Sequence, residues 1–221
     1  MQALKQNERD MGKSGCRIRG LYAVTPNERD TARLTAMVQA AIAGGASLVQ
    51  YRNKAADSSQ RRQQAVALLK VCHAHGVPLV INDDLDLAVE IDADGVHLGQ
   101  DDGSIETARE RLAADRIVGA SCYNRLPAAL AAQRAGATYV AFGSFFPSRV
   151  KPAAVSVALQ LLQEANVALA VPVVAIGGIT AANAPQLVAA GANSVAVISA
   201  LFAARDVEAA ARQIAQLFSL E

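Results

Sequence analysis

The sequence has few aromatic residues, few cysteines and almost no excess of charge. Aromatic residues make up 4% of its 221 residues, and tryptophan is absent. The three cysteines form neither a Cys-x-x-Cys pair nor another metal-ligand spacing, and so sparse and odd a number is typical of a reducing compartment. A formal net charge of +1 creates no overall field that would attract nucleic acid or a membrane surface. We therefore expect neither as a partner.

Long hydrophobic runs are also missing. Pro172 and the polar pair Asn193-Ser194 interrupt the most apolar stretches, so that none reaches the length of a membrane span. The N-terminus lacks the apolar segment of a signal peptide, and we expect a cytoplasmic protein. What the chain has in abundance is aliphatic, because hydrophobic residues make up 52% of it. This composition suits the core of a parallel sheet that helices cover on the outside.

Short apolar runs alternate with segments of helical spacing from Gly20 to the end of the chain. Strands that alternate with helices pair in parallel through right-handed crossovers, and eight such units predict a single α/β domain, a closed (β/α)8 barrel of the TIM type. An open, doubly wound sheet is the second-ranked alternative. We expect a flexible arm at residues 1–19 and the barrel at residues 20–221.

The boundaries of the expected elements follow from this alternation. The expected strands are residues 21–25, 47–52, 78–83, 95–99, 117–122, 138–143, 172–177 and 194–199. The expected helices are residues 31–43, 58–75, 85–91, 105–114, 127–135, 156–168, 182–190 and 207–218. In a barrel of this kind the working residues lie at the C-terminal ends of the strands and in the loops that follow.

Two of the expected strands end in a pair of carboxylates. Asp83 and Asp84 follow one strand, and Asp101 and Asp102 follow the next. Both pairs should lie at the same end of the sheet, where they could hold a hard divalent cation, since Mg²⁺ usually takes one or two carboxylates and leaves its other positions to water and phosphate. The alternative is that these acids cap helices or lie in their first turns.

Cations follow the second expected strand, in the segment Gln50-Tyr-Arg-Asn-Lys54. Strand pleating places Gln50, Arg52 and Lys54 on one face and points Tyr51 and Asn53 the other way. Two cations and an amide on one face suit a polyphosphate, because arginine can bind two oxygens at once and lysine adds a point charge. The alternative is a solvated strand end with an ordinary ion pair.

Other strand ends add further anion-binding groups. Ser121 could donate a hydrogen bond to a phosphate oxygen, although it has no identifiable base for work as a nucleophile and could instead satisfy local backbone. His97, inside a strand, is interpreted as a packed or hydrogen-bonded interior histidine. The loop at residues 145–152 carries two more cations, and the pair Gly177-Gly178 precedes a helix, where backbone N–H groups can approach an anion.

These residues together resemble the thiamine-phosphate synthase family. The resemblance runs from the first expected strand to the last helix and rests on six motifs in order: Gln50-Tyr-Arg-Asn-Lys54, Ile81-Asn-Asp-Asp84, Val96-His-Leu-Gly-Gln-Asp101, Phe146-Pro-Ser-Arg-Val-Lys151, Ala175-Ile-Gly-Gly-Ile179 and Val197-Ile-Ser199. It implies an Mg²⁺-dependent transferase that joins hydroxymethylpyrimidine diphosphate to hydroxyethylthiazole phosphate and releases pyrophosphate. The implied mechanism is dissociative: pyrophosphate departs first, and the thiazole nitrogen captures the pyrimidine-methyl cation.

The resemblance also implies a role for each site residue. The pyrimidine diphosphate would be held by Gln50, Tyr51, Arg52, Asn53, Lys54, Asn82, Ser121 and Lys151, of which Arg52, Lys54, Ser121 and Lys151 would be catalytic. The thiazole phosphate would be held by Ser148, Arg149, Val150, Gly178, Ile198 and Ser199. Mg²⁺ would be held by Asp83 and Asp101.

Three positions depart from the family pattern. Ser148 and Val150 stand where the family usually has threonines, and Tyr123 stands where it often has a histidine. Val150 and Tyr123 are the only support for one alternative, a catalytically silent barrel that binds thiazole phosphate or thiamine phosphate. The other alternative is a thiazole tautomerase on the same barrel, which would need neither the metal pair nor the Gln-x-Arg-x-Lys face. The alanine-rich helices would also suit packing in a homo-oligomer.

Overall fold

A computed structural model describes residues 18–147 and 157–219 of the chain, and within them eight parallel strands close into a barrel. The strands pair in chain order, and β1 also pairs with β8. Their bounds are β1 (Gly20–Val24), β2 (Ala46–Tyr51), β3 (Leu79–Asn82), β4 (Gly95–Leu98), β5 (Ile117–Tyr123), β6 (Tyr139–Phe142), β7 (Val173–Ile176) and β8 (Ser194–Val197). The predicted closed barrel is confirmed, and the pairing of β1 with both β2 and β8 excludes the open sheet.

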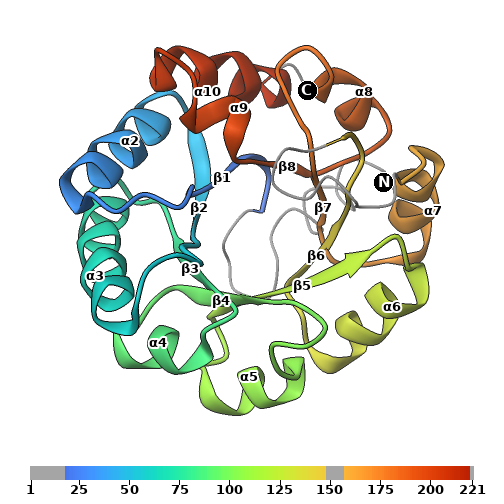
Figure 1. The fold of residues 1–221 in the computed structure, drawn as a ribbon. Coiled ribbons are helices and arrows are strands. Elements are labelled where there is room, and N and C mark those ends of the chain that lie inside the picture. The colour runs from blue at the N-terminus through green and yellow to red at the C-terminus, as the bar shows by residue number, and fades with distance from the viewer. Residues whose placement is uncertain (1–17, 148–156, 220–221) are drawn as a thin grey trace.

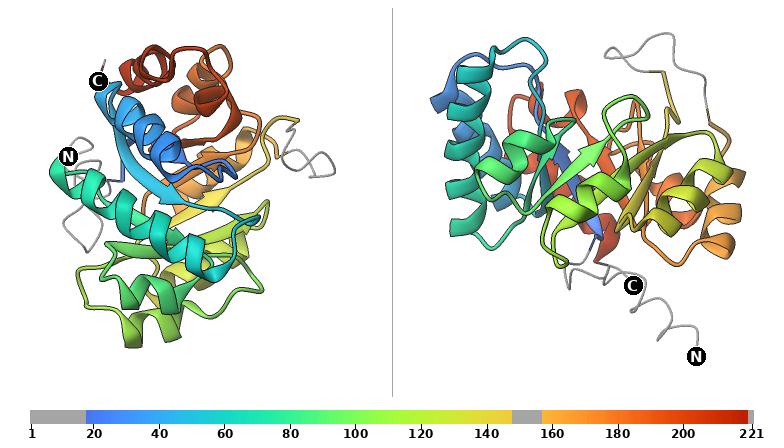
Figure 2. Two further views of the ribbon diagram at one scale, coloured as in Figure 1. Left: turned by 60° about the vertical axis from the view of Figure 1, so that its left-hand side comes forward. Right: turned by 90° about the horizontal axis from the view of Figure 1, so that it is seen from below.

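Helices form an outer ring around the strands (Figure 1), and the turned views show them outside the sheet as well (Figure 2). Their bounds are α2 (Thr31–Ala43), α3 (Ser58–Ala74), α4 (Leu85–Glu90), α5 (Ile105–Arg111), α6 (Leu126–Ala135), α7 (Gln160–Ala168), α8 (Ala184–Ala189), α9 (Ser199–Phe202) and α10 (Val207–Ala215), followed by the 3-10 turn η1 (Gln216–Phe218). None of the helices in these described ranges has both the length and the apolar character that a membrane crossing needs.

Side-chain caps explain where several helices begin. Asp30, Asp57, Asp84, Ser104 and Asp206 each accept a hydrogen bond from a backbone N–H of the first turn that follows. Such a cap satisfies one of the N–H groups that have no partner inside the helix. Each cap therefore fixes the residue at which its helix begins, and with it the end of the connection from the preceding strand.

Several expected boundaries were wrong by one or more residues. The expected helix 105–114 ends at Arg111, because Leu112 has an extended backbone with ψ of 148°. The expected helix 182–190 is shorter and spans Ala184–Ala189. The expected strand 194–199 stops at Val197, and its last residues lead into the short helix α9. The residues expected as the end of a strand thus include Ser199, the first residue of α9.

The hydrophobic core has two parts, one between strands and helices and one inside the barrel. The inner part consists of Ile18, Tyr22, Val24, Leu48, Val80, Ile117, Tyr139, Ala141, Val174 and Ala196. Ile18 is 1% exposed, so this last part of the expected arm packs with the barrel, while residues 1–17 lie outside the described residues. A filled interior leaves chemistry to the end of the barrel at which the strands finish, which we call the mouth.

Candidate active site

Strand pleating divides the segment after β2 between two environments. Gln50 is buried, and its Nε2 donates to the Tyr22 hydroxyl inside the barrel at 2.6 Å. Tyr51 and Asn53 instead donate to Gln64 Oε1 of α3, at 2.9 and 3.0 Å. The predicted alternation is confirmed. The assignment of Tyr51 and Asn53 as substrate ligands stays a prediction, which these contacts with the helix layer do not support.

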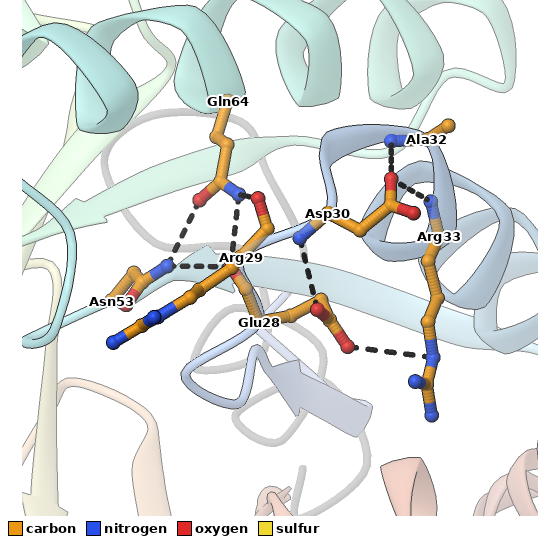
Figure 3. Close-up of polar contacts among 7 residues, drawn as sticks. All are labelled: Glu28, Arg29, Asp30, Ala32, Arg33, Asn53 and Gln64. Carbon is orange, nitrogen blue, oxygen red and sulfur yellow. Dashed lines mark hydrogen bonds and ion pairs between the residues drawn. The ribbon is translucent and has the colours of Figure 1, made fainter.

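Gln64 joins the loop after β1 to the end of β2 (Figure 3). It is fully buried, and its Nε2 donates to the carbonyl oxygen of Glu28 at 2.9 Å. Asn53 Nδ2 donates to the same carbonyl at 2.8 Å. We call Tyr51, Asn53, Gln64 and the backbone of Glu28 and Arg29 the Gln64 cluster. Each buried polar group named here has a partner, as buried groups in native proteins generally do.

The backbone of the two predicted phosphate-binding cations is held by the same loop. The Thr25 hydroxyl donates to the Arg52 carbonyl oxygen at 3.0 Å and accepts from the Arg52 N–H at 2.8 Å. The Lys54 N–H donates to Asn27 Oδ1 at 3.0 Å. The backbone of Arg52 and Lys54 is therefore held in place before any ligand binds. This order lowers the entropy cost of binding.

The cations face a carboxylate of the neighbouring strand. Lys54 Nζ lies 3.3 Å from Asp83 Oδ2. Burial lowers the pKa of the Arg52 guanidinium, and the nearby charge of Asp83 raises it in opposition. Asp83 has a positive φ of 64°, a conformation that aspartate adopts more readily than most residues, and its N–H donates to the His97 carbonyl oxygen at 2.8 Å. The structure thus brings Arg52, Lys54 and Asp83 together at the mouth.

Asp84 caps a helix, whereas Asp101 and Asp102 do not. Asp84 Oδ1 accepts from the Leu87 N–H at 3.0 Å, and Asp84 Oδ2 lies 3.6 Å from Arg61 Nη1. The capping alternative is therefore right for Asp84. Helix α5 is capped by Ser104, so that neither Asp101 nor Asp102 serves as its N-cap.

The carboxyl group that contacts Asp83 is that of Asp102. Burial raises the pKa of Asp102, the charge of Asp83 and a hydrogen bond to it raise that pKa further, and Lys54 and the Gly99 N–H lower it. Asp101 and Asp102 are both exposed in this turn, and of the two only Asp102 interacts with Asp83 among the described residues. A hollow of about 360 Å³ opens beside Asp83 and Asp102. Two carboxyl groups in contact repel each other when both are ionised, unless a cation or a proton lies between them.

Ser121 has a histidine partner that the sequence analysis missed. Its hydroxyl lies 2.8 Å from Nε2 of His97, whose Nδ1 lies 2.8 Å from the hydroxyl of Tyr139. The interior, hydrogen-bonded histidine was expected, but not its link to Ser121. The position of His97 could have indicated this link, because His97 is a polar residue inside an otherwise apolar strand and β4 pairs directly with β5.

The remaining predicted residues lie around the same end of the barrel. Asn82 is half-buried at the end of β3. Gly178, after β7, has a φ of 64°, and a Cβ there would lie 2.4 Å from the Pro147 carbonyl oxygen, so the loops after β6 and β7 pack closely. Ile198 lies directly before α9, and Ser199 is the first residue of that helix. The predicted ligands Ser148, Arg149, Val150 and Lys151 lie outside the described residues.

Comparison with known proteins decides the family. The family model described as "Thiamine monophosphate synthase" matches residues 21–201. The chain belongs to this family. A thiamine-phosphate synthase of Chromobacterium violaceum is 54% identical over 91% of this chain and 97% of its own length, and one of Thiobacillus denitrificans is 56% identical over 91% and 96%.

A solved structure supports the same assignment. The thiamine phosphate pyrophosphorylase of Pyrococcus furiosus is 32% identical, with a TM-score of 0.82 over 96% of this chain and 98% of that one. This member of the thiamine monophosphate synthase family is accordingly an enzyme, a transferase of thiamine biosynthesis that acts on small molecules. The family is one of metal-dependent enzymes. The result favours the synthase over the thiazole tautomerase and the silent barrel.

The Gln64 cluster generates a first prediction, on stability. Gln64→Leu keeps the volume but leaves the Tyr51 hydroxyl, the Asn53 amide and the Glu28 carbonyl with fewer buried partners. We expect the free energy of unfolding to fall by about 2–4 kcal/mol, since each unsatisfied buried group costs roughly 1–3 kcal/mol. Denaturant unfolding measures this change in the free energy of unfolding. Gln63→Leu, at an exposed position of the same helix, is the control and should change it by less than about 0.5 kcal/mol. Equal losses of stability in Gln64→Leu and Gln63→Leu would contradict a stabilising role of the Gln64 cluster.

The contact of Asp83 with Asp102 generates a second prediction, on pH dependence. Because the folded state raises the pKa of Asp102, the protein gains stability as the pH falls through that pKa and loses it as the pH rises. In EDTA, Asp102→Asn should therefore raise Tm at neutral pH, and the difference from the parent should vanish below about pH 4. Asp101→Asn is the matched control and should leave the Tm profile unchanged. A lower Tm for Asp102→Asn at neutral pH would contradict the repulsion.

Proposed function

We propose that the protein transfers the hydroxymethylpyrimidine group from its diphosphate to the nitrogen of hydroxyethylthiazole phosphate, giving thiamine phosphate and pyrophosphate. The observation that carries this proposal is the meeting of Lys54 with Asp83 at 3.3 Å at the mouth, beside Arg52 and Asp102. Cations and carboxylates in such proximity suit a ligand that is itself a metal-bound polyanion. The relatives at about half identity are named for this product.

The donor set fits Mg²⁺. In the described residues no three histidine, cysteine, aspartate or glutamate side chains gather as a metal site by themselves. A site of two carboxylates is what Mg²⁺ usually takes, with water and substrate phosphate filling its other positions. The family resemblance implies Asp83 and Asp101 as the metal ligands, whereas the contact between Asp83 and Asp102 favours Asp102 as the second ligand. When bound, the ion would neutralise charge on the departing pyrophosphate.

Residues of the chain supply the rest of the stabilisation in this proposal. Dissociative departure of pyrophosphate needs fixed positive charge more than a general base. Arg52 and Lys54 would bind the phosphate oxygens from a backbone held by Thr25 and Asn27. Ser121 would donate a hydrogen bond to the leaving group. The filled interior below the mouth supports the exclusion of water that could otherwise capture the pyrimidine-methyl cation.

The thiazole phosphate is assigned to the opposite side of the mouth. Gly178 lies in the loop after β7, and Ile198 and Ser199 follow β8. Barrels of this kind often bind phosphate at the loops after their seventh and eighth strands. Separate sites for the two phosphates would bring the thiazole nitrogen to the pyrimidine while each anion keeps its own donors. We propose that Ser148, Arg149 and Val150 complete the thiazole site and that Lys151 joins the pyrimidine site.

Pyrophosphate release tests the reaction. With both substrates and Mg²⁺ the protein should release pyrophosphate, and EDTA should stop it. Lys54→Met should lower the rate constant by about 10²-fold, in the range for loss of one donor to a developing negative charge. Lys70→Met, at an exposed lysine of α3, is the control and should match the parent. Tautomerisation of a thiazole without metal, or no release at saturating substrates, would replace this proposal by one of its two alternatives.

Metal titration tests which acids bind Mg²⁺. Asp83→Asn and Asp102→Asn should each raise the Mg²⁺ concentration for half-maximal rate by at least about tenfold, which corresponds to 1.4 kcal/mol of binding free energy. Asp101→Asn should change it by less than about threefold. The reverse pattern for Asp101 and Asp102 would identify Asp101 as the second ligand.

A further inference from the structure

A chain of hydrogen bonds crosses the interior of the barrel from Gln50 to Ser121. Gln50 Nε2 donates to the Tyr22 hydroxyl at 2.6 Å, and the hydroxyls of Tyr22 and Tyr139 lie 2.8 Å apart. Tyr139 is 2.8 Å from Nδ1 of His97, and Nε2 of His97 is 2.8 Å from the Ser121 hydroxyl. Both ends of the chain are residues assigned to the pyrimidine diphosphate, and its three middle members are not.

The number of protons on the two tyrosine hydroxyls determines which atom donates in each hydrogen bond of the chain. Burial raises the pKa of both tyrosines, so each phenol keeps its single proton. The Tyr22 oxygen accepts from Gln50. If it also accepted from Tyr139, the Tyr22 proton would have no recorded acceptor among the described residues, in a side chain that is 1% exposed. A buried donor without an acceptor is unfavourable, so Tyr22 donates to Tyr139.

The donors in the remaining hydrogen bonds, from Tyr139 to Ser121, follow from this assignment. Because Tyr139 accepts from Tyr22, its own proton goes to Nδ1 of His97. The neutral imidazole then carries its proton on Nε2, from which it donates to the Ser121 oxygen. The Ser121 proton is left to point away from His97. No other hydrogen bond of Ser121 is recorded within the described residues.

We propose that Tyr139 and His97 are positioning residues that hold Ser121 as a hydrogen-bond donor toward the diphosphate, in a chain whose direction is set by Gln50. This inference rests on the proposed function. The direction matters because a serine that donated to His97 would present only lone pairs to an anion. With its proton free, it can make the stronger hydrogen bond that a charged acceptor allows.

The space around Tyr139 supports this role. A Cβ at Gly119 would lie 2.1 Å from Cζ and 2.3 Å from the hydroxyl oxygen of Tyr139, so the ring can reach His97 only past a glycine. Gly119 needs no special backbone conformation, because it is not among the glycines with positive φ. The Tyr139 ring stacks on His97 at a centroid distance of 5.6 Å and an interplanar angle of 17°. The ring is therefore held by packing as well as by its hydroxyl.

A double-mutant cycle with Tyr139→Phe and Ser121→Ala tests the proposal. Tyr139→Phe should lower kcat with the KM for the thiazole phosphate unchanged, and its effect should shrink by at least about fivefold when Ser121 is already alanine. Equal effects in both backgrounds would overturn the proposal, because a merely structural role of Tyr139 does not depend on Ser121. Thr138→Val removes a buried hydroxyl that hydrogen-bonds to the backbone of Val118, outside the chain from Gln50 to Ser121, and should keep the parental kcat.

A variant at Gly119 tests the chain without changing any atom that it contains. Gly119→Ala should displace the Tyr139 ring and reproduce the fall in kcat of Tyr139→Phe, again only while Ser121 is present. A folded Gly119→Ala protein with parental kcat would overturn the proposal. Circular dichroism checks the fold, and the milder Tyr139→Phe cycle decides the matter if this variant does not fold.

The tautomer of His97 is a readout that needs no turnover. In ligand-free protein with ¹⁵N-labelled histidine, the NMR shifts of His97 should show a neutral ring with its proton on Nε2, and the signals are assigned by their loss in His97→Asn. A proton on Nδ1 would reverse the chain and overturn the proposal. If the parent releases no pyrophosphate, the proposed function fails by itself. If it does, and the cycle shows no coupling, only this inference fails.

Discussion

The contact of Lys54 with Asp83 is the interaction around which the site is organised. It joins a cation after β2 to a carboxylate after β3, and a second carboxyl group, that of Asp102 after β4, lies against Asp83. Arg52 adds a further, partly buried positive charge. Opposite charges this close attract each other, but the two acids repel when both are ionised. In the proposed function, a divalent cation with a diphosphate would satisfy all four groups at once, which no single protein side chain could do.

Closure of the barrel makes this arrangement possible. Parallel strands in chain order place the ends of β2, β3 and β4 side by side. Side chains of the loop after β1 accept hydrogen bonds from the backbone N–H groups of Arg52 and Lys54, and so fix the backbone of these cations before ligand arrives. Part of the rigidity comes from outside the mouth, from Gln64 on α3 (Figure 3). The interior contributes as well, because the tyrosines that fill it also connect Gln50 to Ser121. Packing and site geometry are therefore coupled.

The fold and the segments of the site could be predicted from the sequence, and the pairing of side chains could not. Regular alternation of strands and helices predicts a barrel, and strand pleating separates Gln50 from Tyr51 correctly. The choice between Asp101 and Asp102 depends on the path of a turn that ends at a capping serine, for which the pattern holds no signal. The link from Ser121 to His97 depends on the register between two strands. Such contacts follow from tertiary packing rather than from local propensity.

In the proposed function, the acids after β3 and β4 and the cations after β2 act on one metal-bound diphosphate. A crystal structure with Mg²⁺ and pyrophosphate tests it most directly. We expect the ion to bind Asp83 and Asp102, with pyrophosphate oxygens on both the ion and the side chains of Arg52 and Lys54. Pyrophosphate bound elsewhere on the barrel, with Asp83 and Asp102 facing solvent and no ion between them, would contradict it.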